Sequence, residues 1–132
     1  MITYLQSGNG YNEIDRWQPY CWVNVETPDN EEIAFLTGTL GIPEDFIGDV
    51  SDIDERPRVE RNGEWILAIL RIPVRTPEDG TPYRTVPMGV MICGETIISV
   101  CFYKNELTGD FIEHTRRRNI GVPSAADFTL RI

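Results

Sequence analysis

The sequence has little histidine, few cysteines and no long apolar run, and each shortage excludes a class of protein. Its single histidine, His114, leaves no partner for a histidine-based zinc site or a catalytic triad. The three cysteines are too scattered for a disulfide framework, and reduced thiols in a cytosolic protein are the simplest interpretation. The longest apolar runs are far shorter than the roughly 20 residues that cross a bilayer as a helix. The cysteines are Cys21, Cys93 and Cys101.

Negative charge is the main feature of the composition. The chain carries 21 acidic and 12 basic residues, a formal net charge of -9. Such a chain repels phosphates, so nucleic acid is not expected as a partner, whereas cations are attracted. Solubility alone is the simpler reason for the acidity. No nucleophile with a base is apparent in the sequence, so we do not expect an enzyme.

The pattern of apolar residues predicts one domain of 132 residues in the α/β class, of the α+β type, with a mixed sheet flanked by helices. Hairpin turns are expected at Asn62-Gly63 and Gly94-Glu95. The apolar strand at 64–74 is expected to lie centrally in the sheet. Further strands are expected at 2–5, 11–17, 21–25, 86–93 and 96–102, and a further helix at 107–119.

Two helices are expected between the third strand and the first hairpin. Thr27 is expected to cap the first, and Gly41 to end it. Pro43 opens the second, which carries Asp45, Asp49 and Asp52 at spacings i, i+4 and i+7 and therefore on one stripe. An adjacent apolar stripe is formed by Phe46, Val50 and Ile53.

The acidic stripe is a candidate site for a divalent cation. No basic residue occurs from 44 to 55, and like charges four apart on a helix cost about 0.2–0.5 kcal/mol per pair. A bound ion would relieve that repulsion, and hard ions such as Mg²⁺ prefer carboxylate oxygens. An ordinary solvated acidic face is the alternative that the residues alone leave open.

Several short segments occur in an informative order. The segments are Cys-Trp-Val-Asn-Val-Glu-Thr-Pro from Cys21, Leu-Gly-Ile-Pro from Leu40, Arg-Pro-Arg-Val-Glu from Arg56, the apolar run 65–71, Ile-Ile-Ser-Val from Ile97, and the stretches 111–119 and 124–131. Together they resemble the N-terminal cytoplasmic domain of the CorA-like Mg²⁺/Co²⁺ transporter family, over almost the whole chain.

The resemblance implies a larger protein. Family members join such a domain to a long stalk helix and two membrane helices, assemble as homopentamers, and pass Mg²⁺, Co²⁺ or Ni²⁺, with relatives that move Zn²⁺. We therefore expect residues 1–123 to form the N-terminal domain at the cytoplasmic face of the cell membrane. Residues 124–132 would begin the stalk helix, which we expect to continue past Ile132 toward the pore.

The resemblance also implies a regulatory ion site, with Mg²⁺ or Co²⁺ as both regulatory and transported ion. Counting back from Arg56-Pro57, the family's ion-binding aspartate falls on Asp49, and its partner carboxylate would come from a neighbouring subunit's stalk. Some members have an acid where this chain has Gly48, and this departure either weakens the predicted site or moves a ligand elsewhere, to Asp45 or Asp52. The role requires Asp49 to face another subunit; enclosure in its own domain with an arginine partner would contradict it.

A free-standing soluble protein with the same fold, serving interaction or metal buffering, is the alternative function. Fold alone does not decide between the two. The coding sequence beyond Ile132 discriminates them, because a transporter needs two further apolar stretches of about 20 residues each.

Overall fold

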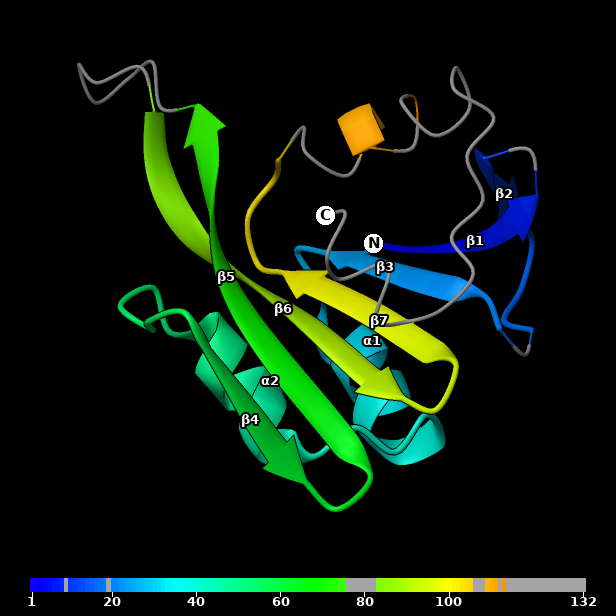
Figure 1. Ribbon diagram of the computed structural model, residues 1–132, viewed down its shortest axis with the longest axis horizontal. Coiled ribbons are helices and arrows are strands. Elements are labelled where there is room, and N and C mark those ends of the chain that lie inside the picture. The colour runs from blue at the N-terminus through cyan, green and yellow to red at the C-terminus, as the bar shows by residue number, and fades with distance from the viewer. Residues whose placement is uncertain (9, 19, 76–82, 106–108, 112, 114–132) are drawn as a thin grey trace.

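A seven-stranded sheet forms the centre of the protein (Figure 1). The computed structural model describes residues 1–8, 10–18, 20–75, 83–105, 109–111 and 113. The strand order is β2-β1-β3-β7-β6-β5-β4, and the sheet is mixed because β3 and β7 run parallel whereas the other neighbours are antiparallel. The expected mixed sheet of an α+β domain is therefore confirmed. The strands are β1 (Ile2–Gly8), β2 (Gly10–Ile14), β3 (Trp22–Glu26), β4 (Arg58–Asn62), β5 (Trp65–Arg75), β6 (Tyr83–Cys93) and β7 (Thr96–Cys101).

Two tight hairpins join the strands on the β4 side of the sheet. The β6–β7 turn lies at Gly94-Glu95, as expected, with Gly94 at φ +60°. The β4–β5 turn is one residue later than expected, because Asn62 pairs with Trp65 and leaves Gly63 at the position that needs positive φ. Strand β5 lies second from the edge and not at the centre, since β4 pairs along its outer side.

The first helical segment begins two residues after its expected cap. Thr27 is not the cap; it has φ +43°, and Asp29 caps α1 (Asn30–Ala34). Asp29 Oδ1 accepts a hydrogen bond from the Glu32 amide at 2.8 Å, and the Asp29 amide donates to Glu32 Oε1 at 3.0 Å. This reciprocal capping box satisfies two amides that would otherwise lack partners. A π-helical turn, η1 (Phe35–Thr39), follows, and Gly41 at φ +80° ends the segment as predicted.

The second helix, α2 (Glu44–Ser51), begins after Pro43 as predicted but ends earlier than expected. Asp52 caps its C-terminus in an extended conformation, and the Asp52 carboxylate accepts the Asp54 amide at 3.0 Å. Aspartate competes well with helix hydrogen bonds in this way. Asp52 and Ile53 therefore do not continue the helical stripes on which the sequence placed them.

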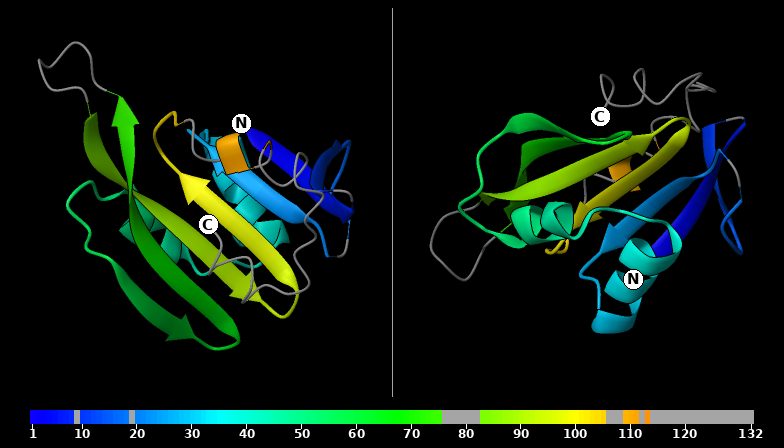
Figure 2. Two further views of the ribbon diagram at one scale, coloured as in Figure 1. Left: turned by 45° about the horizontal axis from the view of Figure 1, so that its top comes forward. Right: turned by 90° about the horizontal axis from the view of Figure 1, so that it is seen from below.

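Helices α1 and α2 and the turn η1 cover one face of the sheet (Figure 2). Phe46 and Val50 of α2 are fully buried there, against Leu67 and Ile69 of β5. A second buried cluster lies on the opposite face, around Trp22, Met88 and Val90. Burying an aliphatic or aromatic side chain contributes about 1.5–3 kcal/mol, so α2 is held mainly by its apolar stripe.

Some expectations lie outside the described residues: most of the helix expected at 107–119, and the boundary between 123 and 124. Within the described part of the chain, no helix has the length and apolar character needed to span a membrane.

Candidate functional site

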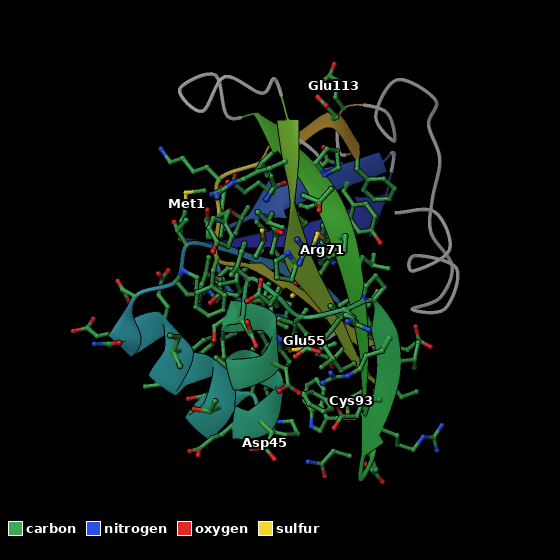
Figure 3. The ribbon with its side chains drawn as sticks, turned by 90° about the vertical axis from the view of Figure 1, so that its left-hand side faces the viewer. Met1, Asp45, Glu55, Arg71, Cys93 and Glu113 are labelled. Carbon is green, nitrogen blue, oxygen red and sulfur yellow. The ribbon has the colours of Figure 1, made fainter. Side chains whose placement is uncertain are left out.

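The three predicted metal ligands lie at different places along and beyond α2. Asp45 is exposed in the first turn, Asp49 is half-buried in the last turn, and Asp52 is exposed at the C-cap. Figure 3 shows Asp45 at the end of α2 that is remote from Glu55 and Arg71. Among the described residues, the three carboxylates therefore do not form a group that could hold a metal ion.

Arg58 gathers Asp49 and two further carboxylates around one guanidinium. Its Nη2 lies 2.7 Å from Asp49 Oδ2 and 2.9 Å from Glu60 Oε2, and its Nη1 donates to Glu55 Oε1. One positive and three negative side chains leave this group, the Arg58 cluster, with a formal charge of -2. All four side chains are partly open to solvent, with Asp49 at 31% exposure.

The alternation of β4 explains why the cluster forms at the end of α2. Arg58 and Glu60 stand opposite Ile69 and Leu67, which belong to the core beneath the helices. Because side chains alternate between faces, both charged residues emerge on the helix side, and Val59 is 75% exposed on the other. Strand β4 thus carries Arg58 to the C-terminal end of α2, where Asp49 lies.

Arg71 fixes the loop that carries Glu55. Its Nη1 donates to the carbonyl oxygens of Ile53 at 2.6 Å and Glu55 at 3.1 Å. Its Nη2 donates to the Thr85 carbonyl at 2.7 Å, which ties the loop to β6. The planar guanidinium can hold several acceptors in one geometry, and the loop between α2 and β4 is positioned by it.

Electrostatics at Asp49 are balanced between opposing influences. Partial burial raises the pKa of Asp49, the Arg58 guanidinium lowers it, and the charges of Glu60, Glu55 and Asp45 raise it, with a net rise. Desolvation lowers the pKa of Arg58, but its hydrogen bond to Glu60 and the neighbouring carboxylates outweigh this and raise it. Burial, followed by the neighbouring acids, thus outweighs the single arginine in setting the pKa of Asp49.

The cluster is not a closed metal cage. Among the described residues, no group of three or more histidine, cysteine, aspartate or glutamate side chains is arranged to hold a metal ion. Asp49 does have an arginine partner, Arg58, which counts against its role as a metal ligand. About a third of the Asp49 side chain nevertheless remains exposed and accessible to a ligand from outside the domain. The assignment of Asp49, Asp45 and Asp52 as ligands stays a prediction.

A separate cavity of about 310 Å³ lies at the turn between β6 and β7, where Figure 3 labels Cys93. Its lining has no charged residue and so offers no carboxylate to a metal. The lining consists of Trp17, Phe35, Thr39, Leu40, Trp65, Cys93 and Thr96.

Sequence reasoning missed the roles of Arg58 and Arg71. A signal for the first was present: in Arg58-Val59-Glu60, alternate residues of a strand share one face, directly after an acidic helix that has no base of its own. No comparable signal marks Arg71, because its partners are backbone carbonyls that are distant in sequence.

Comparisons with known proteins agree with this architecture. The model of one protein family, described as CorA-like Mg²⁺ transporter protein, matches residues 17–132. The fold is similar to that of the complete CorA magnesium transporter from Methanocaldococcus jannaschii, with TM-score 0.77, 20% identity, and coverage of 98% of this chain and 42% of that one.

Two further solved structures have the same fold. The full-length CmaX protein has TM-score 0.75 and 19% identity, over 98% of this chain and 42% of that one. The ZntB cytoplasmic domain from Vibrio parahaemolyticus has TM-score 0.73 and 15% identity, over 98% and 54%. The chain spans about half or less of each of these proteins. No curated protein matched the sequence.

Proposed function

The chain belongs to the CorA-like Mg²⁺ transporter family, and from that membership we propose that it is the cytoplasmic, ion-sensing domain of a divalent-cation transporter. The transported and sensed ion would be Mg²⁺ or Co²⁺, with Ni²⁺ and Zn²⁺ as further candidates. The domain would lie at the cytoplasmic face of the membrane, joined to membrane helices beyond Ile132.

The position of Asp49 is the observation that carries the sensing role. This carboxylate lies at the end of α2, partly exposed, in a cluster with a formal excess of two negative charges. Mg²⁺ is usually held by one or two carboxylates and retains several waters, so one ligand per subunit is enough at an interface. Asp45 and Asp52 are both exposed near the same helix and could contribute through water.

The mechanism that fits this arrangement is negative feedback across a homopentamer. An ion bound between Asp49 and a neighbouring subunit would join the two and favour the closed channel. When the ion is scarce, the acidic surfaces repel one another and the subunits separate. Gating follows only if the ion binds the closed state more tightly than the open one. An affinity near 1 mM, which is about -4 kcal/mol, suits a sensor of an abundant ion.

The test uses the full-length protein and the variant Asp49→Asn. In the native protein, Mg²⁺ should slow proteolysis of the domain, and the variant should lose most of that protection. Glu64→Gln is a matched control, since Glu64 is exposed at the β4–β5 turn and has the same charge. Protection of the Asp49 variant equal to that of the control would exclude Asp49 as a ligand.

A further inference from the structure

We propose that Arg58 is a tethered counter-ion that competes with the divalent cation for Asp49 and thereby sets the ion concentration to which the domain responds. The inference rests on the proposed sensing role of Asp49 and goes beyond it, because it assigns a function to a residue that does not bind the ion. It follows from how the guanidinium is shared within the Arg58 cluster.

Because the Arg58 guanidinium is shared among three carboxylates, Asp49 can leave it at a small cost in free energy. Arg58 Nη2 contacts both Asp49 Oδ2 at 2.7 Å and Glu60 Oε2 at 2.9 Å, whereas Nη1 contacts Glu55. When an ion draws Asp49 away, the guanidinium keeps two carboxylate partners. No charged group is left unpaired, so the large cost of stranding a partly buried charge does not arise.

The charge of the cluster favours one divalent ion. With Arg58 in place, the group of four side chains has a formal charge of -2. A single ion of charge +2 brings that sum to zero, whereas a monovalent ion leaves it negative. Without Arg58 the three carboxylates would carry -3, and any divalent ion would be attracted more strongly. Arg58 therefore lowers the affinity without abolishing it.

The competing groups are held in place by different elements. Asp49 lies on α2 and Glu60 lies on β4. Glu55 lies on the loop between them, and Arg71 donates a hydrogen bond to its carbonyl oxygen. Because Arg58 itself lies on β4, its guanidinium stays beside Glu60 when Asp49 pairs elsewhere. The exchange then needs only a change of side-chain rotamer at Asp49 or Arg58.

The alternative is that Arg58 only joins α2 to β4. In that case its removal would let Asp49 move away from its position, and ion binding would weaken. A counter-ion makes the opposite prediction, because its removal leaves Asp49 unopposed and ion binding strengthens. The sign of the change in Mg²⁺ affinity therefore distinguishes the two roles.

The experiment compares Arg58→Gln with Arg61→Gln in the full-length protein at constant ionic strength. Arg61 lies on the same strand, is exposed, and emerges on the opposite face from Arg58, so its replacement changes the net charge equally without touching Asp49. The readout is the Mg²⁺ concentration that gives half of the maximal protection from proteolysis. Arg58→Gln should lower it by about two- to five-fold relative to Arg61→Gln, as the loss of one exposed ion pair implies.

A second pair of variants tests the exchange if Arg58→Gln does not fold. Glu60→Gln removes one of the two carboxylates with which Arg58 still pairs when Asp49 leaves. Arg58 should then hold Asp49 more firmly, and the required Mg²⁺ concentration should rise. Glu64→Gln, which changes the charge equally at an exposed turn, is its control. Equal values within either pair, or a higher Mg²⁺ requirement in Arg58→Gln, would overturn the role of Arg58.

Asp49→Asn separates this inference from the proposed function. If that variant responds to Mg²⁺ as the native protein does, the sensing site itself is wrong, and the role of Arg58 falls with it. If Asp49→Asn loses the response while Arg58→Gln and Arg61→Gln agree, the sensing site stands and only the counter-ion role is rejected.

Discussion

Val50 of α2 packs directly against Gly89 of β6, and the helix can lie there only because residue 89 has no side chain. A Cβ placed on Gly89 would overlap Val50 Cγ2 and lie 3.2 Å from Leu67 Cδ1. Both neighbours are fully buried, so neither can move aside freely. Since Asp49 directly precedes Val50, this contact also determines where the candidate ion ligand lies relative to β4.

Replacing Gly89 with alanine should therefore destabilise the domain by about 1–3 kcal/mol, the usual cost of overpacking a close-packed core. The added methyl group must displace Val50 and with it the end of α2. The free energy of unfolding in urea measures the effect. Shortening the opposing side chain, in the double variant Gly89→Ala with Val50→Ala, should recover part of the loss relative to the sum of the single changes.

Gly48→Ala is the control for this prediction. Gly48 is exposed on the same helix, and a Cβ there would meet nothing within 4 Å. Alanine at this helical position should stabilise the domain, by up to about 1 kcal/mol. If Gly89→Ala proved as harmless as Gly48→Ala, the close approach of α2 to β6 would be wrong.

Local signals in the sequence predicted most elements of the described fold. Gly94 is placed where its turn needs positive φ, and Pro43 precedes α2, as expected. The cap of α1 was misassigned to Thr27, although Asp29 with Glu32 three residues later is the better capping-box pattern. A single residue such as Thr27 does not reveal this cap, because the cap depends on the reciprocal pair Asp29 and Glu32.

The candidate site was harder to predict because its partners come together only through tertiary structure. Alternation predicts that Arg58 and Glu60 share one face of β4, but it does not predict which face α2 covers, since that depends on the sheet order. The position of the loop after α2 likewise depends on Arg71, which holds the carbonyl of Ile53 from a strand 18 residues away. Asp49 itself was identified by its distance from the Arg-Pro motif, not by the physics of its surroundings.

Ser99 forms a buried polar link between the parallel strands β3 and β7. Its hydroxyl accepts from Trp22 Nε1 at 2.7 Å and donates to Asn24 Oδ1 at 2.8 Å, and the residue is 1% exposed. Ser99→Ala removes the acceptor of a buried indole N–H and should cost about 1–3 kcal/mol in unfolding free energy. Ser51→Ala, at an exposed helix end, should change it by less than about 0.5 kcal/mol. Equal effects of the two changes would contradict the buried link.

Arg71 should be irreplaceable by lysine in the loop between α2 and β4. A lysine retains the charge but cannot reach the carbonyls of Ile53, Glu55 and Thr85 with one planar group. Arg71→Lys should cost about 1–3 kcal/mol, as expected for lost hydrogen bonds from a charged donor. The amide of Glu55, which bonds the Asp52 carbonyl at 3.0 Å, should exchange its hydrogen faster.

Hydrogen exchange measured by NMR tests this effect locally. Arg61→Lys is the control, because Arg61 is exposed on β4. Unchanged exchange at Glu55 in Arg71→Lys would show that the loop is held by other contacts.

The raised pKa of Asp49 predicts an unusual pH dependence of stability. Burial and the surrounding acids raise this pKa despite Arg58, so the folded chain takes up the Asp49 proton at a higher pH than the unfolded chain, whose aspartates titrate near about 3.9. The folded state then binds more protons in that interval, and the contribution of Asp49 to stability grows as the pH falls through the raised pKa. Asp49→Asn cannot titrate and lacks this contribution.

The native chain should therefore gain stability relative to Asp49→Asn as the pH is lowered from 7 toward the ordinary aspartate range, about 3.9, in the absence of divalent ions. Urea unfolding of both proteins across this range measures the difference, in which the titration of groups remote from Asp49 cancels. If the ion pair with Arg58 outweighed burial and the neighbouring acids, the pKa would be lowered and the native chain would lose relative stability on acidification. The slope of that difference thus shows which influence is larger at Asp49.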